Sequence, residues 1–486
     1  METDGWLQVS PRCGQKRNRS LAESEKSMVI NKEKNFEDLN VENLKSEDVS
    51  TLWHHLMRHT GSAPVIMARG DGLRLWDIEG REYLDATSGG VWCVNLGYGR
   101  RELALEIYQQ LLTMPYYVGS AGNIPAIKFA NKITGYTPNL TRIYYSNSGS
   151  EANEKAIKMV RLKSFIEKRP DRNVILYRDR DYHGTTYGAL SCSGQAERTS
   201  GFGPLLEGFQ SIPHALCYRC AFGQSYPGCD LQCARAVEET ILDLGPEKVA
   251  GGIFEPVTAG GGIIVPVREY YQILTETFKK YSLSLIIDEV VCGLGRTGTM
   301  FAYQKYQLAP DLVTMAKGLA SSYMPISVTA ATEQLFAALQ TGEGNLGYFR
   351  DISTFGGSAA AAAAALENLN IIERENLLEN VVRSGEYLLE GLRDNLDHPN
   401  VGDVRGLGLL AGVEFVEDKK TRAPLSEEKV IKVAATMAAK GVLVGRTNRS
   451  LPGYNTIINF APAYVVTGDE LDIILRTFKE TIWQVL

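Results

Sequence analysis

Asp288 and Lys317 each stand at the end of a short apolar run of the sequence, 285–287 and 312–316. Loss of water lowers the pKa of a lysine and makes its amine a better nucleophile. A carboxylate at the end of a buried strand costs several kcal/mol unless a cation is paired with it. The two residues are 29 positions apart, which suits one strand–helix–strand crossover and lets both side chains reach one crevice. For Asp288 alone, a structural salt bridge to a lysine or to Arg296 explains the pattern equally well.

A run of small residues at 146–150 joins a predicted strand to a predicted helix. Ser148 and Glu151 have the spacing of a capping box. The backbone N–H groups of Gly149 and Ser150 then point out of the helix start, where free donors and the helix dipole favour an anion. The segment predicts a phosphate cradle, with an ordinary capped helix as the alternative.

Positioning these residues requires a particular kind of sheet. From about residue 141, short β-rich runs alternate with helical stretches, which predicts an α/β fold with a mostly parallel sheet covered on both faces. In such sheets, ligands bind outside the carboxyl ends of the strands. The runs that carry this prediction are 143–145, 174–177, 252–254, 285–287 and 312–313.

The rest of the chain suggests further parts. Strand-like runs at 413–415 and 441–444 stand beside helices and predict a smaller second α/β domain. We expect a polar arm at 1–46, loose or disordered, and the N-terminal part of the small domain at 47–89. The large domain is expected at 90–358 and the C-terminal small domain at 359–486.

Composition excludes several classes of protein. Apolar residues make up 44% and charged residues 22%, so the chain is not intrinsically disordered. The net charge of −6 gives no basic excess for a nucleic-acid partner. No apolar run approaches the ~20 residues of a membrane helix, and the start lacks a signal-peptide pattern. We expect a cytoplasmic protein with reduced thiols.

A lysine, an acid and an anion cradle are together what pyridoxal 5′-phosphate (PLP) requires for its aldehyde, ring nitrogen and phosphate. From about residue 50 the sequence resembles the class III aminotransferases, a PLP family of fold type I. The motifs that carry the resemblance are Asn-Ser-Gly-Ser-Glu-Ala at 147–152, Tyr-His-Gly at 182–184, Glu-Pro-Val at 255–257, Asp-Glu-Val at 288–290, Gly-Arg-Thr-Gly at 295–298, Ala-Lys-Gly at 316–318, Ser-Thr-Phe-Gly-Gly at 353–357 and Val-Arg-Gly-Leu-Gly at 404–408.

The resemblance implies a role for each motif residue. Lys317 would bind the cofactor aldehyde and later carry the substrate proton, and Asp288 would pair with the ring nitrogen. The other residues implied in cofactor binding are Gly149 and Ser150 at the phosphate, Tyr182 and Val290 on the two ring faces, and His183, Glu255 and Thr354. Because Thr354 would reach the phosphate of a neighbouring subunit, the resemblance implies a homodimer or homotetramer.

The substrates implied are a small amine donor and a 2-oxo acid acceptor. The segment around Trp92 resembles the active-site entry of the ω-amino-acid branch of the family, although a large aromatic residue is often simply core. Arg446 lies where relatives carry an arginine for the acid end of the substrate, and a guanidinium can hold a carboxylate or a sulfonate through two hydrogen bonds. Arg449 is the alternative clamp.

Four cysteines lie close together in the sequence, at Cys217, Cys220, Cys229 and Cys233. Their spacing approaches that of zinc ligands. The alternative is an insertion with reduced structural thiols. Since aminotransferases need no metal, we predict no metal site.

Overall fold

The computed structural model describes residues 40–447 and 455–486. The described residues divide into two compact units: one is formed by 40–69 together with 76–81, the other by 70–75, 82–447 and 455–486. The smaller unit contains α2 (Val41–Thr51), and Lys45 of this helix pairs with Glu79 at 2.6 Å. Most of the predicted polar arm lies outside the described residues, and the domain boundaries stay a prediction.

A seven-stranded sheet forms the centre of the larger unit, in the order β4-β10-β9-β8-β7-β5-β6. All neighbouring pairs are parallel except those of β10, which is antiparallel to both β4 and β9. The prediction of an α/β fold with a mostly parallel sheet is therefore confirmed. The strands are β4 (Arg142–Ser146), β5 (Val174–Arg178), β6 (Phe209–Ile212), β7 (Val249–Phe254), β8 (Ser284–Asp288), β9 (Leu312–Met315) and β10 (Ser327–Ala331).

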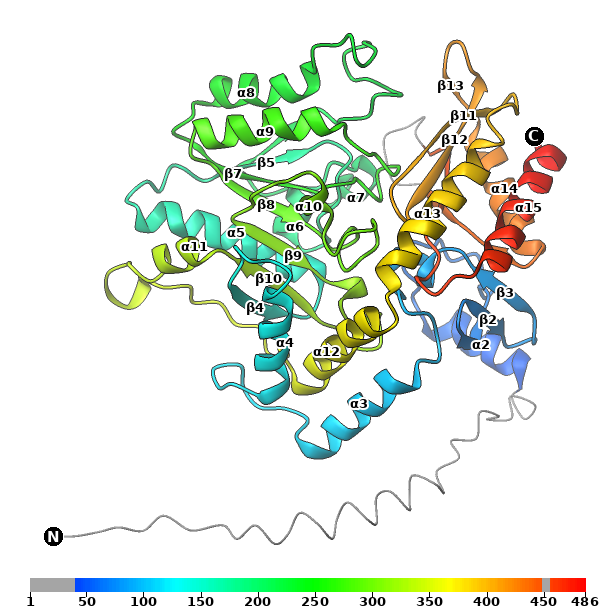
Figure 1. The fold of residues 1–486 in the computed structure, drawn as a ribbon, viewed down its shortest axis with the longest axis horizontal. Helices are drawn as coiled ribbons and strands as arrows, with labels where there is room; N and C mark the ends of the chain where they lie inside the picture. Colours follow the sequence, from blue (N-terminus) through cyan, green and yellow to red (C-terminus); the bar gives the residue numbers. More distant parts are fainter. Residues whose placement is uncertain (1–39, 448–454) are drawn as a thin grey trace, which may run out of the picture. The chain divides into compact units, whose positions relative to one another are not determined.

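Both faces of this sheet are buried, because successive side chains of each strand point to opposite sides. Leu285 and Ile287 of β8 join the core cluster that contains α8 (Gln232–Leu244) and α9 (Arg268–Lys280). Ile286 between them joins a second cluster, with side chains of α5 (Gly149–Ile166). Figure 1 shows α8 and α9 lying side by side, and these two helices pack against each other. The apolar run 285–287 of β8 is thus explained by helices on both faces.

Short helices and one long alanine-rich helix complete this part of the chain. The run of alanines predicted to be helical begins α12 (Ala359–Arg374) and is buried where α12 packs against α3 and α4. Small side chains at these positions let the helices approach closely. The remaining elements are α3 (Arg101–Thr113), α4 (Ile124–Thr134), α6 (Tyr187–Ser191), α7 (Ala196–Thr199), α10 (Ala302–Lys305), α11 (Glu333–Ala338) and the short turns η3 (Ser88–Trp92), η4 (Lys317–Ala320) and η5 (Gly344–Leu346).

The C-terminal part contains an antiparallel sheet in the order β11-β12-β16-β15, with β13 paired to β12. Its strands are β11 (Val401–Gly406), β12 (Ala411–Asp418), β13 (Ala423–Pro424), β15 (Gly445–Thr447) and β16 (Ile457–Phe460). The helices are α13 (Leu377–Arg393), α14 (Glu427–Ala439) and α15 (Gly468–Val485). The run predicted as one strand at 441–444 is shorter, since β14 (Val442–Leu443) ends where it stops pairing with β3 (Glu82–Asp85). Strands β1 (Met67–Asp71) and β2 (Arg74–Asp77) precede β3.

None of the helices in the described part of the chain combines the length and hydrophobicity that crossing a bilayer requires.

Candidate active site

A cavity of about 410 Å³ opens at the carboxyl ends of β8 and β9 and at the start of α5. This is the edge of a parallel sheet at which ligands bind. Eight of the residues predicted from the sequence line this cavity: Gly149, Ser150, Tyr182, His183, Glu255, Asp288, Val290 and Lys317.

Lys317 directly follows β9 and Ala316, and its backbone adopts a left-handed conformation with φ of 45°. This conformation is costly for a residue with a side chain, and such strain is concentrated at functional sites. Burial lowers the pKa of the Lys317 ammonium, an effect that nearby Asp288 and Glu255 oppose. A larger share of the amine is therefore uncharged than for an exposed lysine.

Asp288 ends β8 and is 2% exposed. Its Oδ2 accepts a hydrogen bond from Asn153 Nδ2 at 2.8 Å and lies 2.8 Å from His183 Nδ1, while Oδ1 accepts from the backbone N–H of Val290 at 3.0 Å. No lysine or arginine among the described residues forms an ion pair with it. The salt bridge to Arg296 considered from the sequence is absent, because the Arg296 guanidinium donates to the carbonyl oxygens of Leu409 and Pro462 instead.

The start of α5 forms the predicted turn. Ser148 Oγ accepts from the Glu151 N–H at 3.3 Å, and the Glu151 carboxylate accepts from the Asn147 N–H at 3.0 Å. The helix begins at Gly149, where a Cβ atom would lie 3.0 Å from a Val290 methyl carbon. Glycine therefore lets the helix start approach the side chain that follows Asp288.

A second glycine lies across from this turn. Gly184 has a φ of 147°, and a Cβ there would lie 2.4 Å from Ser150 Oγ. The same Ser150 Oγ accepts from the Thr185 N–H at 3.1 Å. The helix start and the segment after His183 are thus joined at one wall of the cavity.

Glu255 follows β7 and is 3% exposed. Its carboxylate accepts from the Tyr182 N–H at 2.8 Å and from the Ala259 N–H at 3.1 Å. Burial, together with the nearby Asp181 and Asp288 carboxylates, raises the pKa of Glu255 well above its usual range. This residue holds the backbone of Tyr182 in place.

Three predicted residues do not line the cavity. Thr354 is exposed, next to Ser353, whose hydroxyl accepts from Asn147 Nδ2 at 3.0 Å. Trp92 is half-buried, and its indole N–H donates to Asn459 Oδ1 at 3.1 Å.

The third is Arg446, whose Nη1 lies 2.6 Å from a carboxylate oxygen of Glu427 at the start of α14. Its alternative, Arg449, lies outside the described residues.

The four clustered cysteines, Cys217, Cys220, Cys229 and Cys233, line one small cavity of about 20 Å³ together with His214. Each is a free thiol. Across residues 40–447 and 455–486, no group of three or more histidine, cysteine or acidic side chains is arranged to hold a metal ion. Metal binding by these thiols stays untested.

Sequence reasoning missed two residues beside the cavity. Asn153 lies one helical turn after Gly149, bonds Asp288, and accepts from Thr314 Oγ1 at 2.7 Å. Its position four residues into a helix that starts at the cavity was a usable signal. Arg198 places its guanidinium carbon 3.9 Å from the centre of the Tyr182 ring. Nothing in its polar sequence surroundings indicated this contact.

Comparison with known proteins agrees with this geometry. The family model described as aminotransferase class-III matches residues 56–482. A taurine–pyruvate aminotransferase of Rhodobacter capsulatus is 50% identical over 440 residues, which cover 90% of this chain and 95% of that protein. A hypotaurine/taurine–pyruvate aminotransferase of Paracoccus denitrificans is 48% identical over 443 residues, 90% of this chain and 96% of that protein.

A solved structure of a Bacillus anthracis aminotransferase superposes with a TM-score of 0.88 at 38% identity, covering 91% of this chain and 98% of that one. The matches in sequence and in structure each extend over about nine-tenths of the chain. The resemblance stated from the motifs is confirmed, and the chain belongs to the class III aminotransferases.

Proposed function

We propose that the protein transfers the terminal amino group of taurine to pyruvate, giving sulfoacetaldehyde and L-alanine. The observation that carries this proposal is the 50% identity, over 90% of the chain, to a taurine–pyruvate aminotransferase. The cavity that contains Lys317 and Asp288 supports it. One cavity serves both substrates in turn, so we expect ping-pong kinetics.

β-Alanine and similar ω-amino acids are the alternative donors. β-Alanine carries its amine two carbons from a carboxylate, as taurine carries its amine two carbons from a sulfonate. The same cationic side chain can hold either acid group. A difference in rate between these donors therefore has to be measured.

Class III aminotransferases use PLP, and the residues of the cavity fit this cofactor. Within residues 40–447 and 455–486, Asp288 is buried without a lysine or arginine ion-pair partner, so a protonated ring nitrogen would supply the missing positive charge. The start of α5 offers backbone donors to a phosphate, and the glycines at 149 and 184 leave room beside them. When bound, the cofactor supplies an aldehyde for the amine and a ring that accepts an electron pair.

The chain's own residues would position the cofactor as follows. Asp288, held by Asn153, His183 and a backbone N–H, keeps the proton on the ring nitrogen. Tyr182 and Val290, which both line the cavity, cover the two ring faces. Gly149 and Ser150 donate backbone N–H groups to the phosphate, and Glu255 fixes the backbone of Tyr182.

Lys317 would move the proton. Its lowered pKa makes the amine available as a base at the carbon that carries the amino group of the substrate, and as an acid when the proton is returned. The left-handed backbone at Lys317 fixes where the side chain leaves the strand end.

Trp92 and Arg446 would contact the substrate beyond the amine. Trp92 is held by Asn459 and packs against a cluster that includes Val291, one of the cavity residues. Arg446 would bind the acid group after exchanging its Glu427 partner for the substrate. Arg449 remains the alternative clamp.

A homodimer is part of the proposal, with a homotetramer as the larger alternative. Large apolar side chains are exposed around Thr354, including Tyr117 at 66%, Ile352 at 76% and Phe355 at 64%. The Tyr116 and Phe355 rings lie 5.8 Å apart in this region. Burying such a patch against a second copy of the chain is favourable, and it would bring Thr354 to the phosphate of the neighbouring subunit. The cytoplasmic location also stays a prediction.

A panel of amine donors tested against pyruvate, with alanine measured, tests the function. Taurine, hypotaurine, β-alanine and 4-aminobutyrate are compared by kcat/KM in the holoenzyme. The proposal predicts the highest value for taurine. A higher value for β-alanine would assign the alternative function, and no alanine from any donor would refute both.

A further inference from the structure

One cationic side chain beside the cavity has no role in the function proposed above. The guanidinium of Arg198, on α7, lies over the ring of Tyr182 at 3.9 Å, and Tyr182 lines the cavity that contains Lys317. Arg198 Nε donates to Gln195 Oε1 at 2.9 Å. Gln195 is fully buried and donates in turn to the Arg180 carbonyl oxygen at 3.1 Å. The Arg198 side chain is therefore held at two points, by an amide and by an aromatic face.

Arg198 differs from Arg405 and Arg446 in its charge balance. Arg446 pairs with Glu427, and Arg405 pairs with Asp403 and Glu414. Within the described ranges 40–447 and 455–486, no carboxylate forms an ion pair with Arg198, whose direct contacts are Gln195 and Tyr182. Since Nε is used by Gln195, the two terminal nitrogens are left for another acceptor.

The position of this charge suits an anionic substrate. The cavity wall carries Asp288, whose negative charge opposes the entry of an acid. The Arg198 guanidinium lies beside the same space, because it stacks on Tyr182, a wall residue of the cavity, and its charge contributes to lowering the pKa of Lys317. A cation already fixed at the cavity loses little conformational entropy on binding a ligand.

We propose that the terminal nitrogens of Arg198 bind the acid group of the substrate, a sulfonate or a carboxylate. This inference rests on the proposed function, in which amine donor and 2-oxo acid each bring one acid group to the cavity. A guanidinium forms two parallel hydrogen bonds to either group. While the substrate binds, Arg198 Nε keeps its hydrogen bond to Gln195, and the guanidinium plane keeps its contact with the Tyr182 ring.

The test measures anion binding and kinetics separately. The holoenzyme and its variants Arg198→Gln and Arg198→Lys are titrated with ethanesulfonate, which carries the acid group but no amine, in a calorimeter. Arg446→Gln is titrated alongside, because Arg446 is the other arginine assigned to the acid group. We expect Arg198→Gln to weaken ethanesulfonate binding at least tenfold, Arg198→Lys to weaken it less, and the cofactor dissociation constant to stay within twofold. In Arg198→Gln, the KM values for taurine and pyruvate should rise, and kcat should stay within about threefold of the wild-type value.

Two results would overturn the inference. If the wild type binds ethanesulfonate no tighter than Arg198→Gln, Arg198 does not hold the acid group, and a loss confined to Arg446→Gln assigns that role to Arg446. If Arg198→Gln weakens cofactor and ethanesulfonate together and lowers kcat, Arg198 only positions Tyr182. A wild type that binds ethanesulfonate through Arg198 but transfers no amine from taurine would contradict the proposed function and leave the anion site standing.

Discussion

His183 and Asp288 contact each other through Nδ1 and Oδ2 at 2.8 Å, and both side chains are almost completely buried. The other ring nitrogen of His183, Nε2, has no hydrogen-bond partner in the part of the chain that the structure describes. His183 therefore contacts Asp288 through one ring nitrogen, Nδ1. Because Asn153 donates to the same oxygen, Asp288 is oriented from two directions.

Replacing His183 by Phe keeps a ring of similar size and removes one hydrogen bond to Asp288. A hydrogen bond to a charged group contributes about 1.5–3 kcal/mol, so we expect a loss of about tenfold or more in cofactor affinity and in kcat. Cofactor titration by absorbance and steady-state kinetics measure both. Asp288→Asn, which removes the charge itself, is the reference and should lose far more kcat. Unchanged affinity and kcat in His183→Phe would show that this contact is not used.

Gly184→Ala tests the close approach beside Ser150. A Cβ at this position meets Ser150 Oγ at 2.4 Å, and the φ of 147° is strained for any side chain. We expect weaker cofactor binding by at least tenfold, with the fold retained by circular dichroism. Gly201→Ala is a control, since this glycine also has a positive φ but has no atom within 4 Å of a Cβ. Equal effects of the two substitutions would mean that backbone strain alone, rather than the Ser150 contact, weakens cofactor binding.

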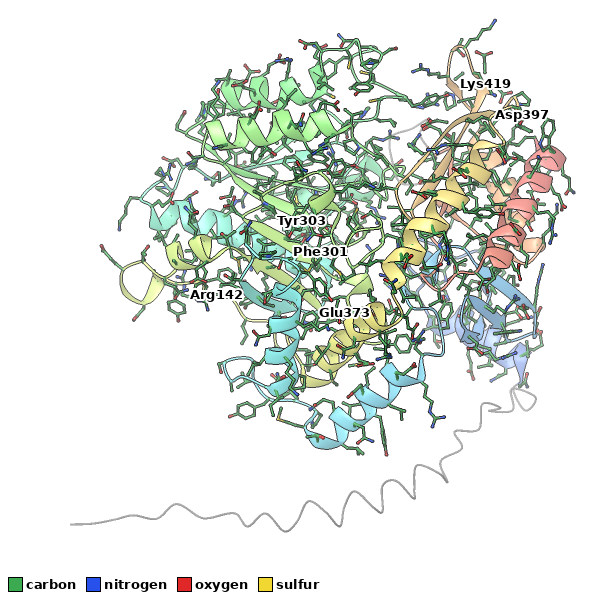
Figure 2. All side chains as sticks on the ribbon, in the orientation of Figure 1. Arg142, Phe301, Tyr303, Glu373, Asp397 and Lys419 are labelled. Atoms are coloured by element: carbon green, nitrogen blue, oxygen red, sulfur yellow. The ribbon has the colours of Figure 1, made fainter. Side chains whose placement is uncertain are left out.

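Glu289 gives a stability prediction that depends on pH. Glu289, which follows Asp288 in the sequence, is fully buried, and its Oε1 accepts a hydrogen bond from the Tyr303 N–H at 2.7 Å. Burial raises the pKa of Glu289 to about 8. Figure 2 labels Tyr303 and Phe301, whose rings are stacked with their centres 5.8 Å apart. Between about pH 4.5 and 8 the folded chain keeps a proton that the unfolded chain releases. Stability from this group therefore falls as pH rises, by about 1.4 kcal/mol per pH unit.

Glu289→Gln removes this titration. We expect the free energy of unfolding of the wild type, relative to the variant, to fall between pH 5 and pH 8 and to level off above the pKa of the carboxyl. Urea unfolding at several pH values measures the difference. A difference that does not change with pH would mean that Glu289 is ionised in the folded protein across the range.

Glu427→Gln tests the clamp role of Arg446. The ion pair at 2.6 Å is partly exposed, and such pairs contribute at most about 1 kcal/mol. If Arg446 must leave Glu427 to bind substrate, the variant should lower the KM for taurine and pyruvate by about two- to fivefold with kcat unchanged. Arg446→Gln should raise both KM values. Unchanged KM values in Arg446→Gln would favour Arg449.

The sequence allowed the convergence of Asp288 and Lys317 to be predicted for a clear physical reason. Asp288 ends one mostly apolar strand and Lys317 follows another, such strands are parallel and buried, and β8 and β9 are direct neighbours. The capped turn before α5 was predictable because it depends on local hydrogen bonds between Ser148 and Glu151. Local patterns of two or three residues therefore predicted the helix start at one wall of the cavity and the positions of Asp288 and Lys317.

Contacts between distant segments could not be predicted in this way. Arg198 of α7 lies over Tyr182, which is in a loop, and Arg446 of β15 pairs with Glu427 of α14, only because separate segments of the chain pack together. The antiparallel direction of β10 has no mark in its own sequence, since a strand buried at every position carries the same kinds of residue in either direction. Such pairings depend on the tertiary fold rather than on spacing along the chain.

Measuring whether PLP is covalently attached to Lys317 tests the proposed function most directly. Purified holoenzyme is reduced with borohydride, digested, and mapped by mass spectrometry, with Lys317→Ala as the control. The account predicts a pyridoxyl group on the peptide that contains Lys317, no label in the variant, and no turnover without this lysine. A label on another lysine, or turnover retained in Lys317→Ala, would contradict it.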